Sequence, residues 1–181
     1  MKYCSGCGEE VVVKVPEGDN RSRFVCESCD TIHYQNPRII AGAIPVHEDK
    51  VLLCKRAIHP RRGFWTLPAG FMENEETIEQ AAQRETFEEA QATIENLQLY
   101  TVMSLPHISQ VYMLFRSEMV DGIFAPGEES LETQLFDEKD IPWEEIAFPT
   151  MSRTLKYFFQ DRSEGAFQMR NVSLFLQKKL R

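Results

Sequence analysis

The stretch GFMENEETIEQAAQRETFEEAQA (residues 70–92) decides how this chain folds. Good helix formers fill residues 76–90, and Thr77 stands where a helix N-cap is expected. At about 100° per residue, six side chains share one arc of roughly a third of the helix circumference. These are Ile78, Ala81, Ala82, Glu85, Glu88 and Glu89. The sequence therefore predicts that three carboxylates continue the stripe that ordinarily faces the core.

Carboxylates that face inward repel one another and lose hydration, which costs several kcal/mol for each unpaired ion. A hard divalent cation relieves both costs, and Mg²⁺ commonly shares its coordination shell with substrate phosphates. Arg84 is placed to orient a carboxylate or to pair with Glu76, two turns earlier. The alternative is a solvated acidic helix with intrahelical Arg–Glu pairs.

The spacing of these residues favours the metal site. Six residues fit the pattern G-x5-E-x7-R-E-x-x-E-E, namely Gly70, Glu76, Arg84, Glu85, Glu88 and Glu89. On average composition, such a match arises in roughly one chain in 10⁵ of this size. The pattern resembles the Nudix box, although Gln91 stands where the box usually has glycine and Thr86 where it has an aliphatic residue.

The resemblance implies a cofactor and its ligands. It implies that Glu85 and Glu89 are the principal ligands of Mg²⁺ (or Mn²⁺), with Glu88 as a third. It also implies that the carbonyl of Ala69 contacts the metal, because this position matches a backbone metal contact found in some members. Gly70 is implied to lie at the substrate. The fold it implies is the Nudix α/β/α sandwich, an α+β architecture with a mixed sheet.

The resemblance also implies catalytic roles. Arg84 corresponds to the orienting arginine of the family and Glu76 to its structural glutamate. A general base from outside the box is expected, because family members often supply a glutamate from a loop after it. Glu128, Glu129 and Glu132 are the candidates here. The alternative for each of them is a solvated acidic turn.

A second metal is predicted at the N-terminus. CSGC and CESC, which contain Cys4, Cys7, Cys26 and Cys29, are separated by 18 residues and fit a known spacing of zinc ligands. Four thiolates satisfy tetrahedral Zn²⁺ with no open position, so the zinc is structural. A disulfide or redox role is the alternative.

The chain is predicted to hold two domains, a zinc ribbon over residues 1–36 and a Nudix domain over residues 37–181. The boundary falls at YQNP, because Pro37 disfavours helix at the preceding residue. The ribbon is too short of core formers to fold without its metal. His33 is expected to be a hydrogen-bond partner within it, and Cys54 is expected to be an inert core thiol.

Apolar runs after the boundary predict strands at 39–48, 51–56, 64–71, 93–106, 110–120, 133–136 and 167–177. A second amphipathic helix is predicted over residues 149–161, and residues 125–132 are predicted to form an acidic loop. Short strands mixed with two helices are typical of a layered sandwich with a mixed sheet.

Composition limits the partners. The net charge of −8 and pI near 5.1 argue against broad binding to nucleic acid, which requires a basic surface. No apolar run is long enough for a membrane span, and MKYCSGCGEE lacks an apolar signal core, so a cytoplasmic location is expected.

The substrate prediction rests on resemblance. A zinc ribbon before a Nudix box resembles the NADH-diphosphatase branch, whose S-Q-P-W-P-F-P motif is replaced here by SLPHISQ (residues 104–110). YQNP, VLLCKR, GFWTLPAGFME and FAPGEESLE are instead similar to pyrophosphatases acting on ADP-ribose and FAD. That similarity implies AMP as one product and a homodimer as the assembly. The alternatives are an NADH diphosphatase and a non-catalytic regulator that binds ADP-ribose or nucleic acid.

Several side chains outside the box are candidates for substrate contact. Phe64, Tyr112 and Phe148 can stack on adenine, although each can equally be a core residue. Arg61 and Arg62, in the loop before the box, can reach a phosphate. Simple solvent exposure explains these two arginines equally well.

Overall fold

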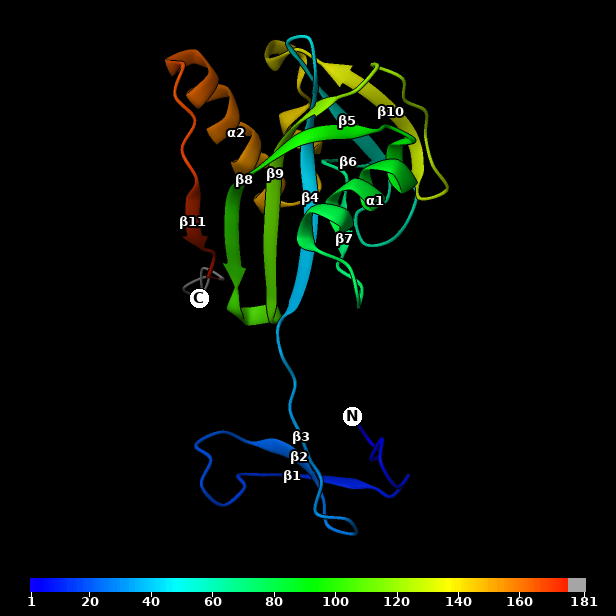
Figure 1. The fold of residues 1–181 in the computed structure, drawn as a ribbon, viewed down its shortest axis with the longest axis vertical. Helices are drawn as coiled ribbons and strands as arrows, with labels where there is room; N and C mark the ends of the chain where they lie inside the picture. The colour runs from blue at the N-terminus through cyan, green and yellow to red at the C-terminus, as the bar shows by residue number, and fades with distance from the viewer. Residues whose placement is uncertain (176–181) are drawn as a thin grey trace. The chain divides into compact units, whose positions relative to one another are not determined.

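The computed structural model describes residues 1–175 and divides the chain into two compact units that meet between Pro37 and Arg38. The predicted boundary after residue 36 differs from this by one residue. The first unit contains one small sheet, and the second contains one large sheet with two long helices (Figure 1).

The N-terminal unit is built from three short antiparallel strands, β1 (Val11–Lys14), β2 (Arg23–Cys26) and β3 (Ile32–His33), in that order across the sheet. Its buried hydrophobic side chains are Val25 and two of the cysteines, Cys4 and Cys26. So small a core does not stabilise a unit of this length, which is why a further cross-link is needed.

The C-terminal unit is an eight-stranded mixed sheet in which β4 is central. Its strands are β4 (Arg38–His47), β5 (Lys50–Arg56), β6 (Trp65–Thr66), β7 (Ala69–Phe71), β8 (Ile94–Leu105), β9 (Gln110–Met119), β10 (Ser130–Phe136) and β11 (Arg170–Ser173). The main path runs β10-β5-β4-β9-β8-β11, while β6 pairs with β5 and β7 with β4. The β4–β9 and β8–β11 pairs are parallel, and the others are antiparallel.

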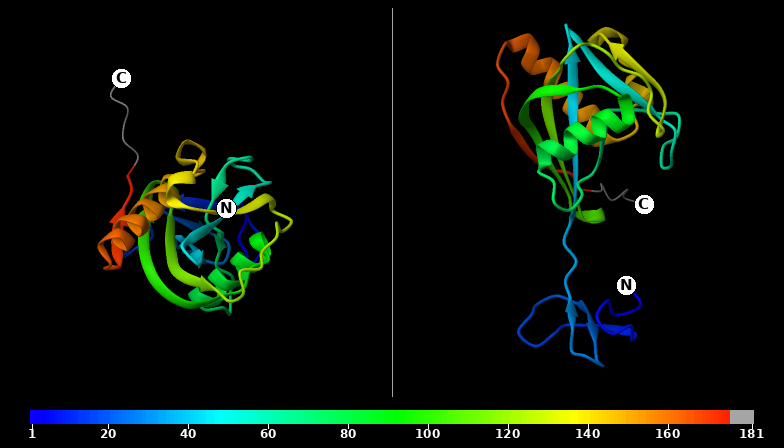
Figure 2. Two further views of the ribbon diagram at one scale, coloured as in Figure 1. Left: turned by 90° about the horizontal axis from the view of Figure 1, so that it is seen from above. Right: turned by 45° about the vertical axis from the view of Figure 1, so that its right-hand side comes forward.

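One helix covers each face of the sheet, α1 (Ile78–Ala90) on one side and α2 (Pro149–Glu164) on the other (Figures 1 and 2). Alternation along β4 shows this directly. Ala41 belongs to the cluster with the small residues of α1, whereas Ile44 belongs to the cluster with the aromatic residues of α2. Both faces of β4 are therefore buried, and the predicted α/β/α sandwich is confirmed.

The predicted helices are confirmed, with α1 beginning two residues later than expected. The predicted loop over residues 125–132 is wrong at its end, because β10 begins at Ser130 rather than at residue 133. Polar residues can occupy this strand because it lies at the edge of the sheet, where it pairs with β5 alone. Of the predicted final strand, residues 170–173 form β11, and residues 176–177 lie outside the described residues.

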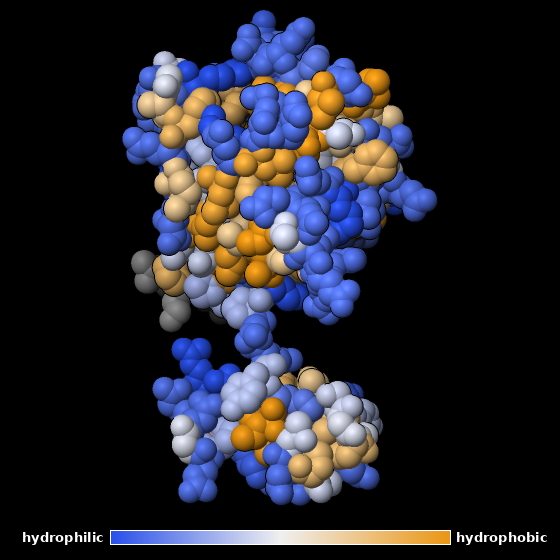
Figure 3. Space-filling model, viewed as in Figure 1, coloured by the Kyte–Doolittle hydropathy of each residue, from blue (hydrophilic) through white to orange (hydrophobic). Residues whose placement is uncertain are grey.

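The outer face of α1 is hydrophilic, and apolar side chains gather beside it over β8 and β9 (Figure 3). Among residues 1–175, no helix is both long enough and apolar enough to cross a membrane.

Candidate active site and metal sites

The acidic helix α1 starts with a capping box. Thr77 Oγ1 accepts a hydrogen bond from the Gln80 amide at 3.2 Å, and Gln80 Oε1 accepts one from the Thr77 amide at 2.7 Å. Further along, Thr86 is fully buried and its hydroxyl donates to the Ala82 carbonyl at 2.7 Å. Because its polar atom is satisfied within the helix, Thr86 fits the position where an aliphatic residue is usual.

Gln91 ends the helix in the left-handed conformation that normally favours glycine, with φ of 49°. Its amide donates to the Phe87 carbonyl at 2.7 Å, and its side-chain Nε2 donates to the Pro126 carbonyl at 3.2 Å. The substitution of glycine by glutamine therefore leaves the direction of the chain unchanged.

Arg84 organises the surface of α1 that faces the preceding loop. Its Nε and Nη2 donate to both oxygens of Glu76, at 3.0 and 2.8 Å, and its Nη2 also donates to the Phe71 carbonyl at 3.0 Å. Its Nη1 donates to Glu85 at 2.7 Å and to Glu88 at 3.0 Å. Hydrogen bonding from Arg84 lowers the pKa of Glu76 to about 2. The geometry contains the pairing of Arg84 with Glu76 and its contacts with Glu85 and Glu88, while the orienting role of Arg84 in catalysis stays a prediction.

Glu89 is the most buried carboxylate of the site, with 6% of its surface exposed. Burial, followed by the nearby charge of Glu85, raises its pKa to about 8. Its hydrogen bond from the Ala69 amide, at 3.4 Å, and the charge of Arg56 offset this only partly. Burial also raises the pKa of Glu85. A cation at this position would remove the energetic cost of ionising both groups.

Glu88 does not point inward as predicted. Its side chain is 56% exposed and lies along the helix surface with Arg84, one turn earlier. Within residues 1–175, the cysteines form the one group of three or more potential ligands whose atoms all lie within 4.8 Å. The structure therefore brings Glu85 and Glu89 together, while Glu88 must rotate to join them.

Gly70 leaves the space that the Glu85 carboxylate occupies. A Cβ placed on Gly70 would lie 2.2 Å from Glu85 Oε2. The φ angle of Gly70 is not positive, so what excludes a side chain here is the carboxylate rather than the backbone. Glycine is therefore required at this position of the box because any larger residue would collide with the Glu85 carboxylate.

We expect Gly70→Ala to lower kcat/KM about a hundredfold, because it displaces Glu85 by roughly 1 Å from its position. The midpoint of thermal unfolding should change little, since the displaced group is the flexible end of a side chain. The matched variant is Gly165→Ala, at the C-cap of α2, where φ is 69°. Apart from its chain neighbours, no atom of the described residues lies within 4 Å of a Cβ added there. That variant should lower the midpoint and leave turnover unchanged. Equal turnover in the two variants would contradict the assignment.

The loop after β9 is attached to the last turn of α1. The Gly127 amide donates to the Glu89 carbonyl at 3.1 Å, and a Cβ on Gly127 would lie 1.7 Å from the Glu88 carbonyl oxygen. This close approach brings the next two residues, Glu128 and Glu129, to the site. The charge of Glu129 contributes to the raised pKa of Glu89, so Glu129 is the better placed of the two.

Glu132 is not part of the site. It lies on β10 opposite Lys55, and the two side chains form an ion pair of 3.3 Å at the surface. Its prediction as a base depended on a loop that continued past residue 129, and strand pairing ends that loop at Ser130.

We name the hollow over these residues the acidic cavity. It encloses about 930 Å³ and contains six carboxylates and two arginines. Its lining residues are Arg56, Ile58, Ala69, Gly70, Phe71, Glu73, Arg84, Glu85, Phe87, Glu88, Glu89, Gln91, Gly127, Glu128 and Glu129.

A second hollow, the aromatic cavity, adjoins it and encloses about 770 Å³. The two share Arg56, Ala69, Gly70 and Phe71 as a common wall. The remaining lining residues are Ile40, Pro60, Thr66, Leu105, His107, Ile108, Gln110, Tyr112, Phe148, Pro149, Thr150, Met151, Arg153, Leu174 and Phe175. Tyr112 and Phe148, predicted as stacking residues, therefore lie in one cavity beside the acidic one.

Three other predicted contacts are elsewhere. Arg61 stacks its guanidinium over Phe64, 5.2 Å from the ring centre, and Arg62 is exposed. In the described part of the chain, none of the three lines either cavity. The arginine that lines both cavities is Arg56, the last residue of β5, whose Nε donates to the Pro60 carbonyl at 2.9 Å. The only sequence signal for it was a basic residue at the end of a buried strand.

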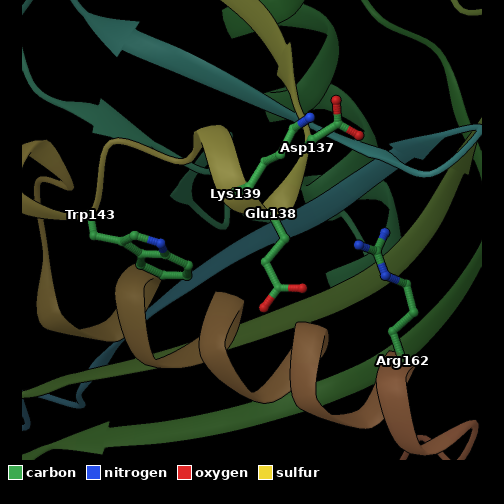
Figure 4. A pocket seen from close by; sticks show the side chains of 5 residues that line it. All are labelled: Asp137, Glu138, Lys139, Trp143 and Arg162. Carbon is green, nitrogen blue, oxygen red and sulfur yellow. The ribbon is translucent and has the colours of Figure 1, made fainter.

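A separate depression of about 630 Å³ lies against α2 (Figure 4). Asp137, Glu138, Lys139, Trp143 and Arg162 line it, and none of them lines the other two cavities. Glu138 points between Trp143 and Arg162 in this view. Its mixed charges do not extend the acidic site.

The four N-terminal cysteines converge. All four Sγ atoms lie within 4.8 Å of one another, with Cys4 and Cys29 at 3.7 Å and Cys7 and Cys26 at 3.4 Å. Zinc–sulfur bonds of about 2.3 Å in a tetrahedron place sulfurs about 3.8 Å apart, so the cluster fits zinc. A hydrogen bond of 3.1 Å with the Thr31 hydroxyl lowers the pKa of Cys29 to about 6, whereas hydrogen bonds with Cys29 and Cys26 raise the pKa of Cys7 to about 12. Metal binding must therefore release protons from this cluster.

His33 Nε2 lies 3.3 Å from Cys4 Sγ, which confirms His33 as a hydrogen-bond partner inside the ribbon. Cys54 is 1% exposed in the second unit, on β5, and burial raises its pKa well above the usual value. It is therefore a core thiol, as predicted.

Comparison with known proteins agrees with this geometry. Residues 36–161 match the family model for the NUDIX domain, and residues 2–35 match the model described as Nudix N-terminal, a zinc ribbon. A NUDIX hydrolase from Nitrosomonas europaea of known structure is 56% identical, with a TM-score of 0.94 over 97% of this chain and 99% of that one.

Curated relatives include two proteins named NAD-capped RNA hydrolase NudC. The one from Photobacterium profundum is 30% identical over 75% of this chain and 49% of its own, and the one from Escherichia coli is 32% identical over 78% and 53%. This chain thus spans about half the length of these relatives. The NUDIX match covers most of the chain and contains every residue of the box, and the chain accordingly belongs to the Nudix hydrolase family.

Proposed function

We propose that this protein is a Mg²⁺-dependent (or Mn²⁺-dependent) pyrophosphohydrolase that cleaves the diphosphate of ADP-ribose, FAD or both into AMP and a second monophosphate. The observation that carries the proposal is the junction of the two cavities. A set of carboxylates suited to hold a cation lies beside an aromatic cavity, with Arg56 in the wall between them. A nucleotide-linked diphosphate has the same two parts, a charged centre and a planar group next to it.

The residues of the acidic cavity fit a hard cation. Glu85 and Glu89 would hold it, with Glu88 and the Ala69 carbonyl as further ligands, and oxygen donors of this kind suit Mg²⁺. When bound, such an ion withdraws charge from phosphorus and acidifies water. Gly70 preserves the space in which the Glu85 carboxylate lies.

The protein's own residues supply the remaining functions. Arg56 neutralises the phosphate that leaves, and Arg84 holds Glu85 in orientation. Glu129 accepts a proton from the attacking water, whose oxygen bonds to one phosphorus as the bond to the bridging oxygen breaks. Two monophosphates result. Glu128 is the alternative base, because it follows the same anchored Gly127.

A second candidate is hydrolysis of NADH or a related NAD-linked diphosphate, which the names of the NudC relatives favour. The turn that replaces the S-Q-P-W-P-F-P motif is relevant here. Leu105, His107, Ile108 and Gln110 of that turn line the aromatic cavity, so the replaced segment bears directly on which planar group is accepted.

A substrate panel tests the proposal. We expect AMP release from FAD and ADP-ribose with kcat/KM at least about tenfold above that for NADH, and none without a divalent cation. Product formation is measured chromatographically in matched reactions. Preference for NADH would replace the proposal with the second candidate. Tight binding of ADP-ribose without turnover would instead indicate a regulator.

A further inference from the structure

The first turn of α2 has no side-chain cap for its backbone amides. Its N-cap is Phe148, which has no capping side chain, and no described residue supplies one. Pro149 follows and has no amide hydrogen. The amides of Met151 and Ser152 donate back to the Phe148 carbonyl at 3.0 and 3.1 Å. The amide of Thr150 remains without a hydrogen-bond acceptor among the described residues, and it lies at the positive end of the helix dipole.

Thr150 has a second unsatisfied group. Its side chain is 2% exposed, and its hydroxyl oxygen has no hydrogen-bond partner among residues 1–175. Buried hydroxyls normally have partners, so this one, beside a cavity, requires a partner that the described chain does not supply. Threonine in a helix readily occupies two χ1 rotamers, and exchange between them turns the hydroxyl to where the methyl group was.

The cavity that Thr150 lines is rich in donors and lacks carboxylates. Arg56, His107 and Arg153 line it, and the described lining includes no Asp or Glu. This contrasts with the six carboxylates of the acidic cavity next to it. The Arg56 guanidinium also stacks over Phe148, 5.2 Å from the ring centre. A group that enters between these donors is matched when its edge offers a carbonyl acceptor at each end, and the side-chain carbonyl of Gln110, which also lines the cavity, can accept from an N–H between them.

We propose that the aromatic cavity binds a planar ring with a cyclic imide edge, O=C–NH–C=O, and that a carbonyl oxygen of this edge caps α2 at Thr150. The ring lies against Tyr112 and Phe148. The isoalloxazine of a flavin and the base of a uridine nucleotide share this edge. The inference rests on the proposed function and deepens it, since it assigns the cavity to the FMN half of FAD rather than to AMP. Adenine offers one ring-nitrogen acceptor and an amino donor at the corresponding edge, so it supplies one acceptor to these donors where the imide supplies two.

Binding of the monophosphates to the full-length protein tests this assignment. FMN is followed by quenching of its fluorescence, and UMP and AMP by calorimetry. We expect FMN to bind more tightly than AMP. Thr150→Val, which keeps the shape and removes the hydroxyl, should weaken FMN about tenfold, whereas Thr150→Ser should bind it as the wild type does. The matched control is Thr133→Val on β10, another buried hydroxyl without a partner in the described chain, which lines neither cavity and should have no effect.

The possible results distinguish the imide subsite from its alternatives. Tighter binding of AMP than FMN, or unchanged FMN affinity in Thr150→Val with a wild-type unfolding midpoint, overturns the assignment. If Thr150→Val does not fold, AMP tighter than FMN in the wild type remains the overturning result. UMP binding tighter than FMN, with the same sensitivity to Thr150, supports the imide edge and identifies a uridine nucleotide as its source. FMN binding without hydrolysis of either FAD or ADP-ribose would reject the proposed reaction and leave this subsite standing.

Discussion

Glu89→Gln is expected to lower kcat about a thousandfold while the protein remains folded. The substitution keeps the shape of a side chain that is 6% exposed and removes the negative charge that a cation requires. A metal typically contributes several kcal/mol to transition-state stabilisation, and each 1.4 kcal/mol is tenfold in rate. Turnover of the best substrate in the panel, together with Mn²⁺ affinity, measures the effect.

The matched control is Glu132→Gln, an identical chemical change at an exposed residue outside the acidic cavity. It should retain wild-type turnover, and loss of activity in both variants would reject the metal assignment.

The wild type and Glu89→Gln are also expected to differ in how their stability depends on pH. Because the folded pKa of Glu89, about 8, exceeds the usual 4.5, the metal-free wild type loses unfolding free energy as pH rises from about 4.5 to 8. Metal-free Glu89→Gln should lose less across that range, as denaturant titrations at each pH would show.

Cys26→Ser is expected to reduce zinc from one ion per chain to almost none and to unfold the N-terminal unit. Cys26 is completely buried and lies 3.4 Å from Cys7, so its loss removes both a ligand and part of the small core. Val25 and Cys4 alone do not provide enough buried apolar surface to compensate. Elemental analysis gives the zinc content, and limited proteolysis shows whether cleavage is confined to residues 1–37.

Cys54→Ala serves as the comparison, since Cys54 is also buried but belongs to the second unit. It should retain one zinc per chain and an intact N-terminal unit. A Cys26→Ser protein without zinc that resists proteolysis as well as the wild type does would show that the cysteines are not a structural metal site.

The sequence was sufficient for features that depend on spacing along one element. Helical periodicity and the box located Glu85 and Glu89, and the capping signal located Thr77. Glu88 was misplaced because periodicity gives the direction of a side chain from the axis but not its pairing with Arg84.

Features that depend on the meeting of distant segments were not predictable in the same way. Arg61 and Arg62 stood closer to the box in sequence, yet it is Arg56, at the end of β5 where this strand pairs with the start of β10, that lines both cavities. Glu132 was excluded by a strand pairing with Lys55 that no local pattern in residues 125–132 indicates. The unpaired hydroxyl of Thr150 has no sequence signature, because it is recognised only from the lack of a hydrogen-bond partner among the described residues.

The tight packing of Gly127 on the end of α1 has an evolutionary consequence. The position of Glu128 and Glu129 relative to the box glutamates is fixed by contacts between main-chain atoms of Gly127 and of the last turn of α1. Replacement of exposed side chains in the preceding segment, such as Ile123, can therefore accumulate without altering the catalytic alignment. Gly127 itself should be constrained, although it carries no functional group.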